Sequence, residues 1–223
     1  MKLVIPCAGE SSRMAYVPKH LITINGRPLI THVIETWKDK VDSFVFVLKR
    51  AQTHMWEYLP QNSAVVFQDE PLGLANAILQ ARECVSGPFT VALGDCLHRG
   101  TFIPTAARMG FGAWSTNDLK EVNKSYLIRE EKTGLHLLEK PNLQPTTAGP
   151  FLCGMGTYFL DERVFNYIEN YKGVKGGGDL TFILQTMIDN REPLQPIPFH
   201  GSYVNIGSPE DIAKAEEILR DKV

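Results

Sequence analysis

The sequence has 223 residues, of which 43% are hydrophobic and 22% charged, and its formal net charge at pH 7 is −2. This composition is that of a globular protein of about one domain, and the lack of a basic excess argues against a nucleic-acid binder. No apolar run has the length of a membrane span, and the four cysteines show no metal-ligand spacing. We therefore expect reduced thiols in a cytoplasmic protein with no membrane partner.

Strand-like and helical patterns alternate over the first hundred residues. The sequence predicts strands at 2–8, 44–49, 64–68 and 88–95, and helices at 28–39, 54–60 and about 73–84. This order predicts a parallel sheet with helices on both faces and a ligand at the carboxyl ends of its strands.

The pattern is less regular after residue 95. Strands are expected at 112–117, 125–132, 134–141, 151–160 and 196–206, and helices at 161–171, 179–190 and 209–222. Together the two parts predict an α/β fold with a doubly wound, mostly parallel mixed sheet. We expect one domain, residues 1–223.

A small-residue turn follows the first strand, and its backbone N–H groups are suited to bind an anion. Arg13 and Lys19 add two positive charges to the rim of the turn. This combination predicts a triphosphate site, whose turn consists of Ala8, Gly9, Glu10, Ser11 and Ser12.

These residues resemble the signature A-G-x-G-[ST]-R-[ML] … P-K of the nucleotidyltransferases that make sugar nucleotides, with Ser11 where that family usually has its second glycine. Further motifs of the same family follow along nearly the whole chain. They are QDEPLGLANAI (68–78), ALGDC (92–96), LEKP (138–141), FLCGMGTYFL (151–160), GDLTFIL (178–184) and YVNIGSPED (203–211). The resemblance is to the single-domain short form, without a hexapeptide-repeat acyltransferase domain, and it implies a Rossmann-like fold of the GT-A type.

The resemblance also implies roles for individual residues. Arg13, Lys19 and Lys140 are expected to be catalytic, with Lys140 on the acceptor phosphate, and Asp95 and Asn205 to hold Mg²⁺, which prefers hard oxygen ligands. Residues 1–97 would bind the nucleotide and residues 98–223 the acceptor. Nucleotide-binding residues beyond the turn would be Gln68, Pro71, Gly73 and Gly94, and acceptor-binding residues Glu139, Gly156, Thr181 and Tyr203.

The implied reaction transfers NMP from an NTP to a sugar 1-phosphate and releases pyrophosphate. An amide at Gln68 favours UTP or dTTP because it could both donate to and accept from the imide edge of the base. A cytidylyltransferase acting on phosphocholine or a polyol phosphate stays open, as does a nucleotide-sensing module without turnover. A GT-A glycosyltransferase is disfavoured because the sequence has no D-x-D motif. The partners are therefore an NTP and a phosphorylated small molecule, and a homo-oligomer stays open.

Overall fold

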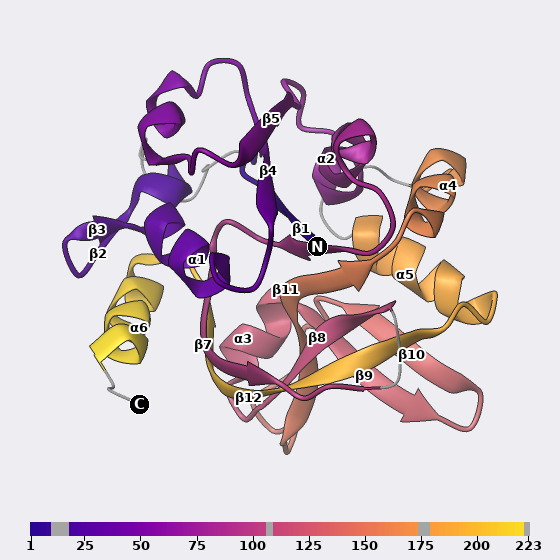
Figure 1. The fold of residues 1–223 in the computed structure, drawn as a ribbon. Helices are drawn as coiled ribbons and strands as arrows, with labels where there is room; N and C mark the ends of the chain where they lie inside the picture. The colour runs from indigo at the N-terminus through magenta and orange to yellow at the C-terminus, as the bar shows by residue number, and fades with distance from the viewer. Residues whose placement is uncertain (10–17, 106–108, 174–178, 221–223) are drawn as a thin grey trace.

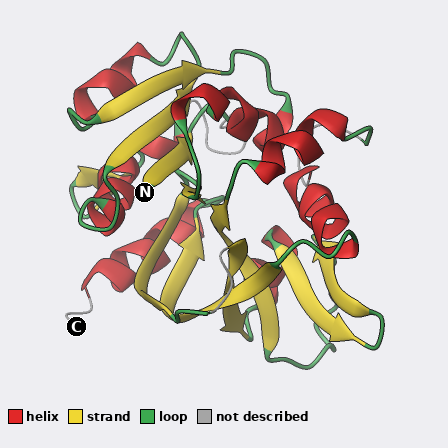
Figure 2. Ribbon diagram, turned by 45° about the vertical axis from the view of Figure 1, so that its right-hand side comes forward, coloured by secondary structure: helices red, strands yellow, loops and turns green. Residues whose placement is uncertain are grey.

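The structure is a computed structural model that describes residues 1–9, 18–105, 109–173 and 179–220. Its centre is a ten-stranded sheet, flanked by helices (Figures 1 and 2). The strands of this sheet are β1 (Lys2–Pro6), β4 (Ser43–Leu48), β5 (Ser63–Phe67), β6 (Phe89–Ala92), β7 (Cys96–Phe102), β8 (Met109–Thr116), β9 (Tyr126–Glu131), β10 (Gly134–Glu139), β11 (Phe151–Leu160) and β12 (Leu194–Asn205).

Six α-helices and a small hairpin complete the regular structure of the described residues. The hairpin pairs β2 (Thr23–Ile24) with β3 (Arg27–Pro28). The helices are α1 (Leu29–Trp37), α2 (Gly73–Gln80), α3 (Leu119–Lys124), α4 (Arg163–Asn170), α5 (Asp179–Asp189) and α6 (Pro209–Arg220), with short 3₁₀ turns η1 (Lys19–Leu21), η2 (Thr53–Tyr58) and η3 (Arg82–Cys84).

The sheet has a parallel part and a mixed part. Strands run in the order β5-β4-β1-β6-β11-β8-β12-β7, and the first four are parallel. β11 is antiparallel to both β6 and β8, and β9 and β10 extend the sheet from β11. The predicted doubly wound mixed sheet is therefore confirmed.

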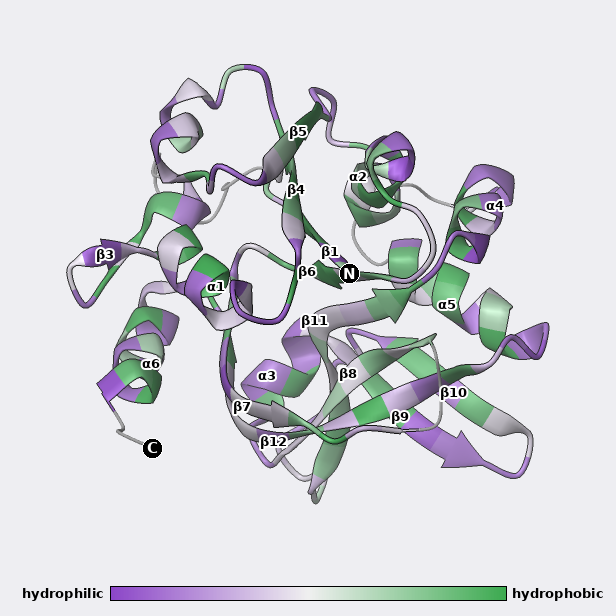
Figure 3. Cartoon of the chain, viewed as in Figure 1, coloured by the Kyte–Doolittle hydropathy of each residue, from purple (hydrophilic) through white to green (hydrophobic). Residues whose placement is uncertain are grey.

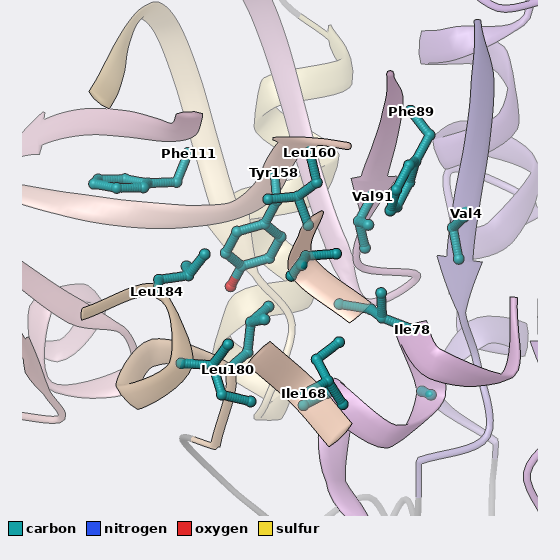
Figure 4. Packing of buried hydrophobic residues seen from close by; sticks show 14 of the residues in the cluster. Val4, Ile78, Phe89, Val91, Phe111, Tyr158, Leu160, Ile168, Leu180 and Leu184 are labelled. Carbon is teal, nitrogen blue, oxygen red and sulfur yellow. The ribbon is translucent and has the colours of Figure 1, made fainter. Parts of the chain in front are cut away.

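The alternation of side chains along β1 divides the core between the two faces of the sheet. Leu3 and Ile5 are fully buried in a cluster that includes residues of α1 and α6. Val4 points the other way, into a cluster with residues of α2, α4 and α5. Figure 4 shows part of this second cluster, and Figure 3 shows the hydrophobic character of β5 and β6. Helices thus cover both faces, as the strand–helix order predicts.

One strand, β11, joins the two parts of the sheet. Its C-terminal residues 157–160 pair with β6, and β8 pairs with its N-terminal residues 151–154 and again with Tyr158 and Phe159. The register shifts between Gly154 and Tyr158. Gly156 lies in this irregularity with φ +66°, and its carbonyl accepts a hydrogen bond from Leu93 N at 2.9 Å. The bulge therefore lies beside the residues that follow β6.

Most predicted elements are present. The short helix predicted at 54–60 is a 3₁₀ helix, Thr53–Tyr58, and the helix predicted at about 73–84 is divided into α2 and η3. The β2–β3 hairpin, strand β7 and helix α3 were not predicted. Within the described ranges, no helix is long and apolar enough to cross a membrane.

Candidate active site

Two adjoining pockets open where the parallel strands end. Residues that directly follow β1, β5 and β6 line the first, which has a volume of about 310 Å³. The second has a volume of about 120 Å³ and lies between α2, α5 and the mixed part of the sheet. Leu74 and Leu93 line both pockets, so the two spaces share a wall. We call them the first pocket and the second pocket.

Most of the described residues predicted to bind nucleotide line the first pocket. Its lining comprises Pro6, Ala8, Gly9, Lys19, His20, Gln68, Pro71, Gly73, Leu74, Ala77, Leu93 and Asp95. The predicted contributions of Glu10, Ser11, Ser12 and Arg13 fall outside the described residues.

Gly94 is a predicted nucleotide-binding residue that lines neither pocket. A Cβ atom added there would lie 2.7 Å from Cys7 Sγ and 2.9 Å from the His20 ring. The absence of a side chain at Gly94 therefore allows Cys7 and His20 to pack closely beside the first pocket.

His20 is 5% exposed, and burial lowers the pKa of its ring to about 4 in spite of the nearby Asp95 carboxylate. The ring is thus neutral at pH 7.

Lys19 and Asp95 face one another in the first pocket. Lys19 Nζ donates to Asp95 Oδ2 at 3.2 Å, and both side chains keep about a quarter of their surface exposed. Lys19 is the first residue of η1, which follows Pro18 directly. The pair puts one positive and one negative group into the pocket that Ala8 and Gly9 also line.

Gln68 is buried, and its amide hydrogens are used within the protein. Nε2 donates to the Gly73 carbonyl and to Asn76 Oδ1, each at 2.9 Å. The side chain thus fixes the first residue of α2, and its carbonyl oxygen is the part of the amide not taken up by these bonds. For a bound base this leaves Gln68 as an acceptor rather than as both donor and acceptor.

Asp95 and Asn205, the predicted metal ligands, come together although 110 positions separate them. Asn205 pairs with Cys96 across β12 and β7, and Ile206 N donates to the Asp95 carbonyl at 2.9 Å. Asp95 lines the first pocket and Asn205 the second. No group of three or more His, Cys, Asp or Glu side chains suited to a metal occurs in the parts of the chain that the structure describes.

The predicted acceptor residues all line the second pocket. Thr181 Oγ1 donates to Glu139 Oε2 at 2.7 Å, and Lys140 Nζ lies 3.3 Å from Glu139 Oε1. A Cβ at Gly156 would lie 2.9 Å from Cys96 Sγ. Tyr203 is buried, and its hydroxyl lies 3.3 Å from the same sulfur. Lys140, Glu139 and Thr181 thus form one connected polar group.

Several residues of the second pocket were not predicted, among them Lys124, Tyr126 and Tyr158. Lys124, the last residue of α3, donates to Asp211 Oδ1 at 2.6 Å and to the Asn205 carbonyl at 3.4 Å. Burial raises the pKa of the Tyr126 and Tyr158 hydroxyls, so both stay neutral. Both tyrosines lie in strands that the sequence predicts, whereas Lys124 has no comparable signal in the sequence.

A larger cavity, with a volume of about 740 Å³, lies elsewhere, between α4 and α5. Two of its charged residues pair with one another, since Arg163 Nη1 donates to Glu192 Oε2 at 2.6 Å, and Tyr167 donates to Glu192 Oε1 at 3.0 Å. None of the described residues predicted for the site lines this cavity. We therefore place the candidate active site at the two smaller, adjoining pockets.

The chain has an α/β fold with two adjoining pockets, and it is similar to known nucleotidyltransferases. Residues 3–105 match the family model of the MobA-like NTP transferase domain. The bifunctional protein GlmU of Methanococcus maripaludis is 26% identical over an alignment of 230 positions, which covers 100% of this chain and 55% of the relative. The chain thus spans about half the length of this curated relative.

Solved structures with the same fold cover nearly the whole chain. The inositol-1-phosphate CTP transferase from T. maritima superimposes with a TM-score of 0.80 at 19% identity, covering 98% of this chain and 94% of that one. A UDP-glucose pyrophosphorylase complexed with UDP-glucose gives 0.77 at 22% identity, with coverages of 98% and 97%. The chain resembles the NTP transferase family, as its motifs predicted.

Proposed function

We propose that this chain is a nucleotidyltransferase that transfers NMP from an NTP to a phosphorylated small molecule and releases pyrophosphate. Our first candidates are UTP or dTTP as the donor and a sugar 1-phosphate as the acceptor. Residues 1–97 would bind the nucleotide and residues 98–223 the acceptor. The protein would act in the cytoplasm.

One observation carries the proposal: a pocket with Lys19 and Asp95 adjoins a pocket with Lys140 and Asn205. A reaction between two phosphorylated molecules needs two spaces that meet, and positive groups that offset the repulsion between the phosphates. Two structural neighbours, an inositol-1-phosphate CTP transferase and a UDP-glucose pyrophosphorylase, carry names of this reaction type.

The chemistry requires positioning more than proton transfer. An oxygen of the acceptor phosphate forms the new bond to the α-phosphorus, the bond to the bridging oxygen breaks, and pyrophosphate leaves with that electron pair. The attacking phosphate is ionised at neutral pH, so no general base is needed. Lys19 and Lys140 would hold the two phosphates in line, and Arg13 with the turn after β1 would hold the leaving pyrophosphate.

Asp95 and Asn205 fit a magnesium ion as ligands. Both offer hard oxygen donors, and the pairing of β12 with β7 puts them on neighbouring backbones at the junction of the pockets. Mg²⁺ is usually bound by one or two protein oxygens together with substrate phosphates. When bound, the ion would neutralise charge on the α-phosphate. Lys19, within 3.2 Å of Asp95, would keep that carboxylate oriented.

The second candidate is a cytidylyltransferase, and the hydrogen bonds of Gln68 support this alternative. With both amide hydrogens used by Gly73 and Asn76, Gln68 offers a base only its carbonyl oxygen. That oxygen accepts from the imide N–H of uracil or thymine, and equally from the amino group of cytosine. The neighbour with a TM-score of 0.80 is an inositol-1-phosphate CTP transferase, which is consistent with this alternative.

A pyrophosphate-release assay tests the proposal. UTP, dTTP, CTP and GTP are each combined with glucose 1-phosphate, N-acetylglucosamine 1-phosphate, inositol phosphate and phosphocholine, with and without Mg²⁺. We expect turnover with at least one pair, dependent on Mg²⁺ and lost in Asp95→Asn. Asp189→Asn, an exposed carboxylate at the far end of α5, is the matched control. No turnover with any pair and no nucleotide binding by calorimetry would contradict the proposal.

A further inference from the structure

Asp179 is a buried carboxylate that lines the second pocket and contacts α2, whose first residues line the first pocket. It is the first described residue of α5 and is 2% exposed. Its Oδ2 and Oδ1 lie 3.3 and 3.4 Å from the amide nitrogen of Ala75, and Oδ1 accepts from Leu180 N at 2.8 Å. A buried charge is costly without partners, so these contacts have to be maintained in the folded protein.

Ala75 is the third residue of α2, and its N–H is one of those that a helix cannot satisfy itself. Leu72, at the N-cap position, provides no side-chain cap. Asp179 therefore caps α2 from a different element, 104 positions away. A negative charge at this end of a helix is also favourable toward the helix dipole.

Each of the two helices carries part of one pocket. Gly73 and Leu74, at the start of α2, line the first pocket, and Gly73 is fixed by Gln68. Thr181, two residues after Asp179, lines the second pocket and donates to Glu139. An unbroken series of contacts thus runs from Gln68 through α2 and Asp179 to Glu139.

We propose that Asp179 is a positioning residue that sets the distance between the two half-sites by joining the N-terminus of α2 to that of α5. This inference rests on the proposed function, because the distance matters only if two substrates react. Asp179 touches neither phosphate in this scheme. It holds the helices whose residues do the binding, and a displacement of about 1 Å between reacting groups costs about a hundredfold in rate.

Two variants and one control test the proposal. Asp179→Asn keeps the size of the side chain and removes its charge, whereas Asp179→Ala removes both acceptors. Asp189→Asn changes an exposed carboxylate on the same helix. Hydrogen exchange of residues 72–80 is measured without substrate. We expect at least threefold faster exchange there in Asp179→Ala, a smaller effect in Asp179→Asn, and no change in the control.

Steady-state kinetics with the best substrate pair then separates positioning from stability. We expect kcat to fall at least tenfold in Asp179→Asn, with each KM changed less than threefold, at a temperature where the variant is fully folded. Unchanged exchange of residues 72–80 in both variants would overturn the connection. Faster exchange with unchanged kcat would overturn the positioning role. A wild type without turnover would contradict the proposed function instead, while the exchange measurement still decides the connection between the helices.

Discussion

Replacing His98 with phenylalanine should make the folded protein less sensitive to acid. His98 is 6% exposed and lies among the rings of Trp37, Phe102 and Phe199, with centroid distances of 5.7, 5.5 and 5.2 Å. Neither ring nitrogen has a hydrogen-bond partner among the residues that the structure describes. Burial, and to a lesser degree the charge of Lys40, lower the pKa of the ring from 6.5 to about 4.

The direction of the effect follows from proton binding. Between these two pKa values the unfolded chain binds a proton at His98 and the folded chain does not, so the unfolded state gains stability as the pH falls. The full contribution of the neutral ring is present above pH 6.5 and is lost progressively toward pH 4. Linkage gives a loss of about 2 kcal/mol in the free energy of unfolding between about pH 7.5 and about pH 5. His98→Phe has no proton to bind and should lose about 2 kcal/mol less.

Urea unfolding at both pH values, followed by circular dichroism, measures the difference. Each protein is compared with itself, so any change in packing caused by the larger ring cancels. His20, whose pKa is also lowered to about 4, is present in both proteins and contributes equally. His200→Phe, on an exposed position of β12, is the control for an added phenyl ring. Equal losses in wild type and His98→Phe would refute the reasoning.

Four substitutions test the candidate site itself. Asp95→Ala should abolish pyrophosphate release without lowering the melting temperature, and near-normal activity of this variant would show that Asp95 is not a metal ligand. Lys140→Ala should reduce turnover while calorimetry shows unchanged NTP affinity; lost NTP binding would put Lys140 on the nucleotide side. Gln68→Ala should weaken the use of UTP, dTTP and CTP alike, because the carbonyl oxygen of Gln68 can accept a hydrogen bond from either kind of base; competition assays in which CTP is best in both proteins would favour the cytidylyltransferase, and a substitution that changes the order of the three nucleotides would contradict this role of Gln68. Lys124→Met leaves the Asp211 carboxylate without its closest cation and should cost about 1–3 kcal/mol in urea unfolding; an unchanged midpoint would show that the pair adds no stability.

The elements with a strong local signal could be predicted from the sequence. The apolar residues of α1 recur on one face, and the strands of the parallel part are continuous hydrophobic runs. α3 has only six residues, too few for a periodic pattern, and it depends on tertiary contacts such as Lys214 Nζ with Asp118 Oδ2. β7 ends in a polar stretch and is a strand because β12 pairs with it along seven positions.

In the candidate site, too, residues that belong to a local motif could be predicted, and relations that depend on tertiary contacts could not. Motifs predicted the individual residues, but the spatial relation of Asp95 to Asn205 depends on the pairing of β7 with β12, which no local pattern records. Lys124 was missed because its place depends on α3. The hydrogen bonds from the Gln68 amide to Gly73 and Asn76 could not be predicted either, since they depend on the conformation of the chain between β5 and α2.

The position of β11 has a consequence for protein engineering. The C-terminal part of this strand is paired with β6 on one side and with β8 on the other, and its N-terminal part is paired with β8, so residues 98–223 are not a detachable module. Exchanging that segment for the corresponding part of another protein would require the incoming strand to reproduce both the pairing with β6 and the irregularity at Gly156. A shift of one residue in this strand would turn its buried side chains to the opposite face. Changes of acceptor are therefore better sought by substituting individual side chains of the second pocket than by recombining halves.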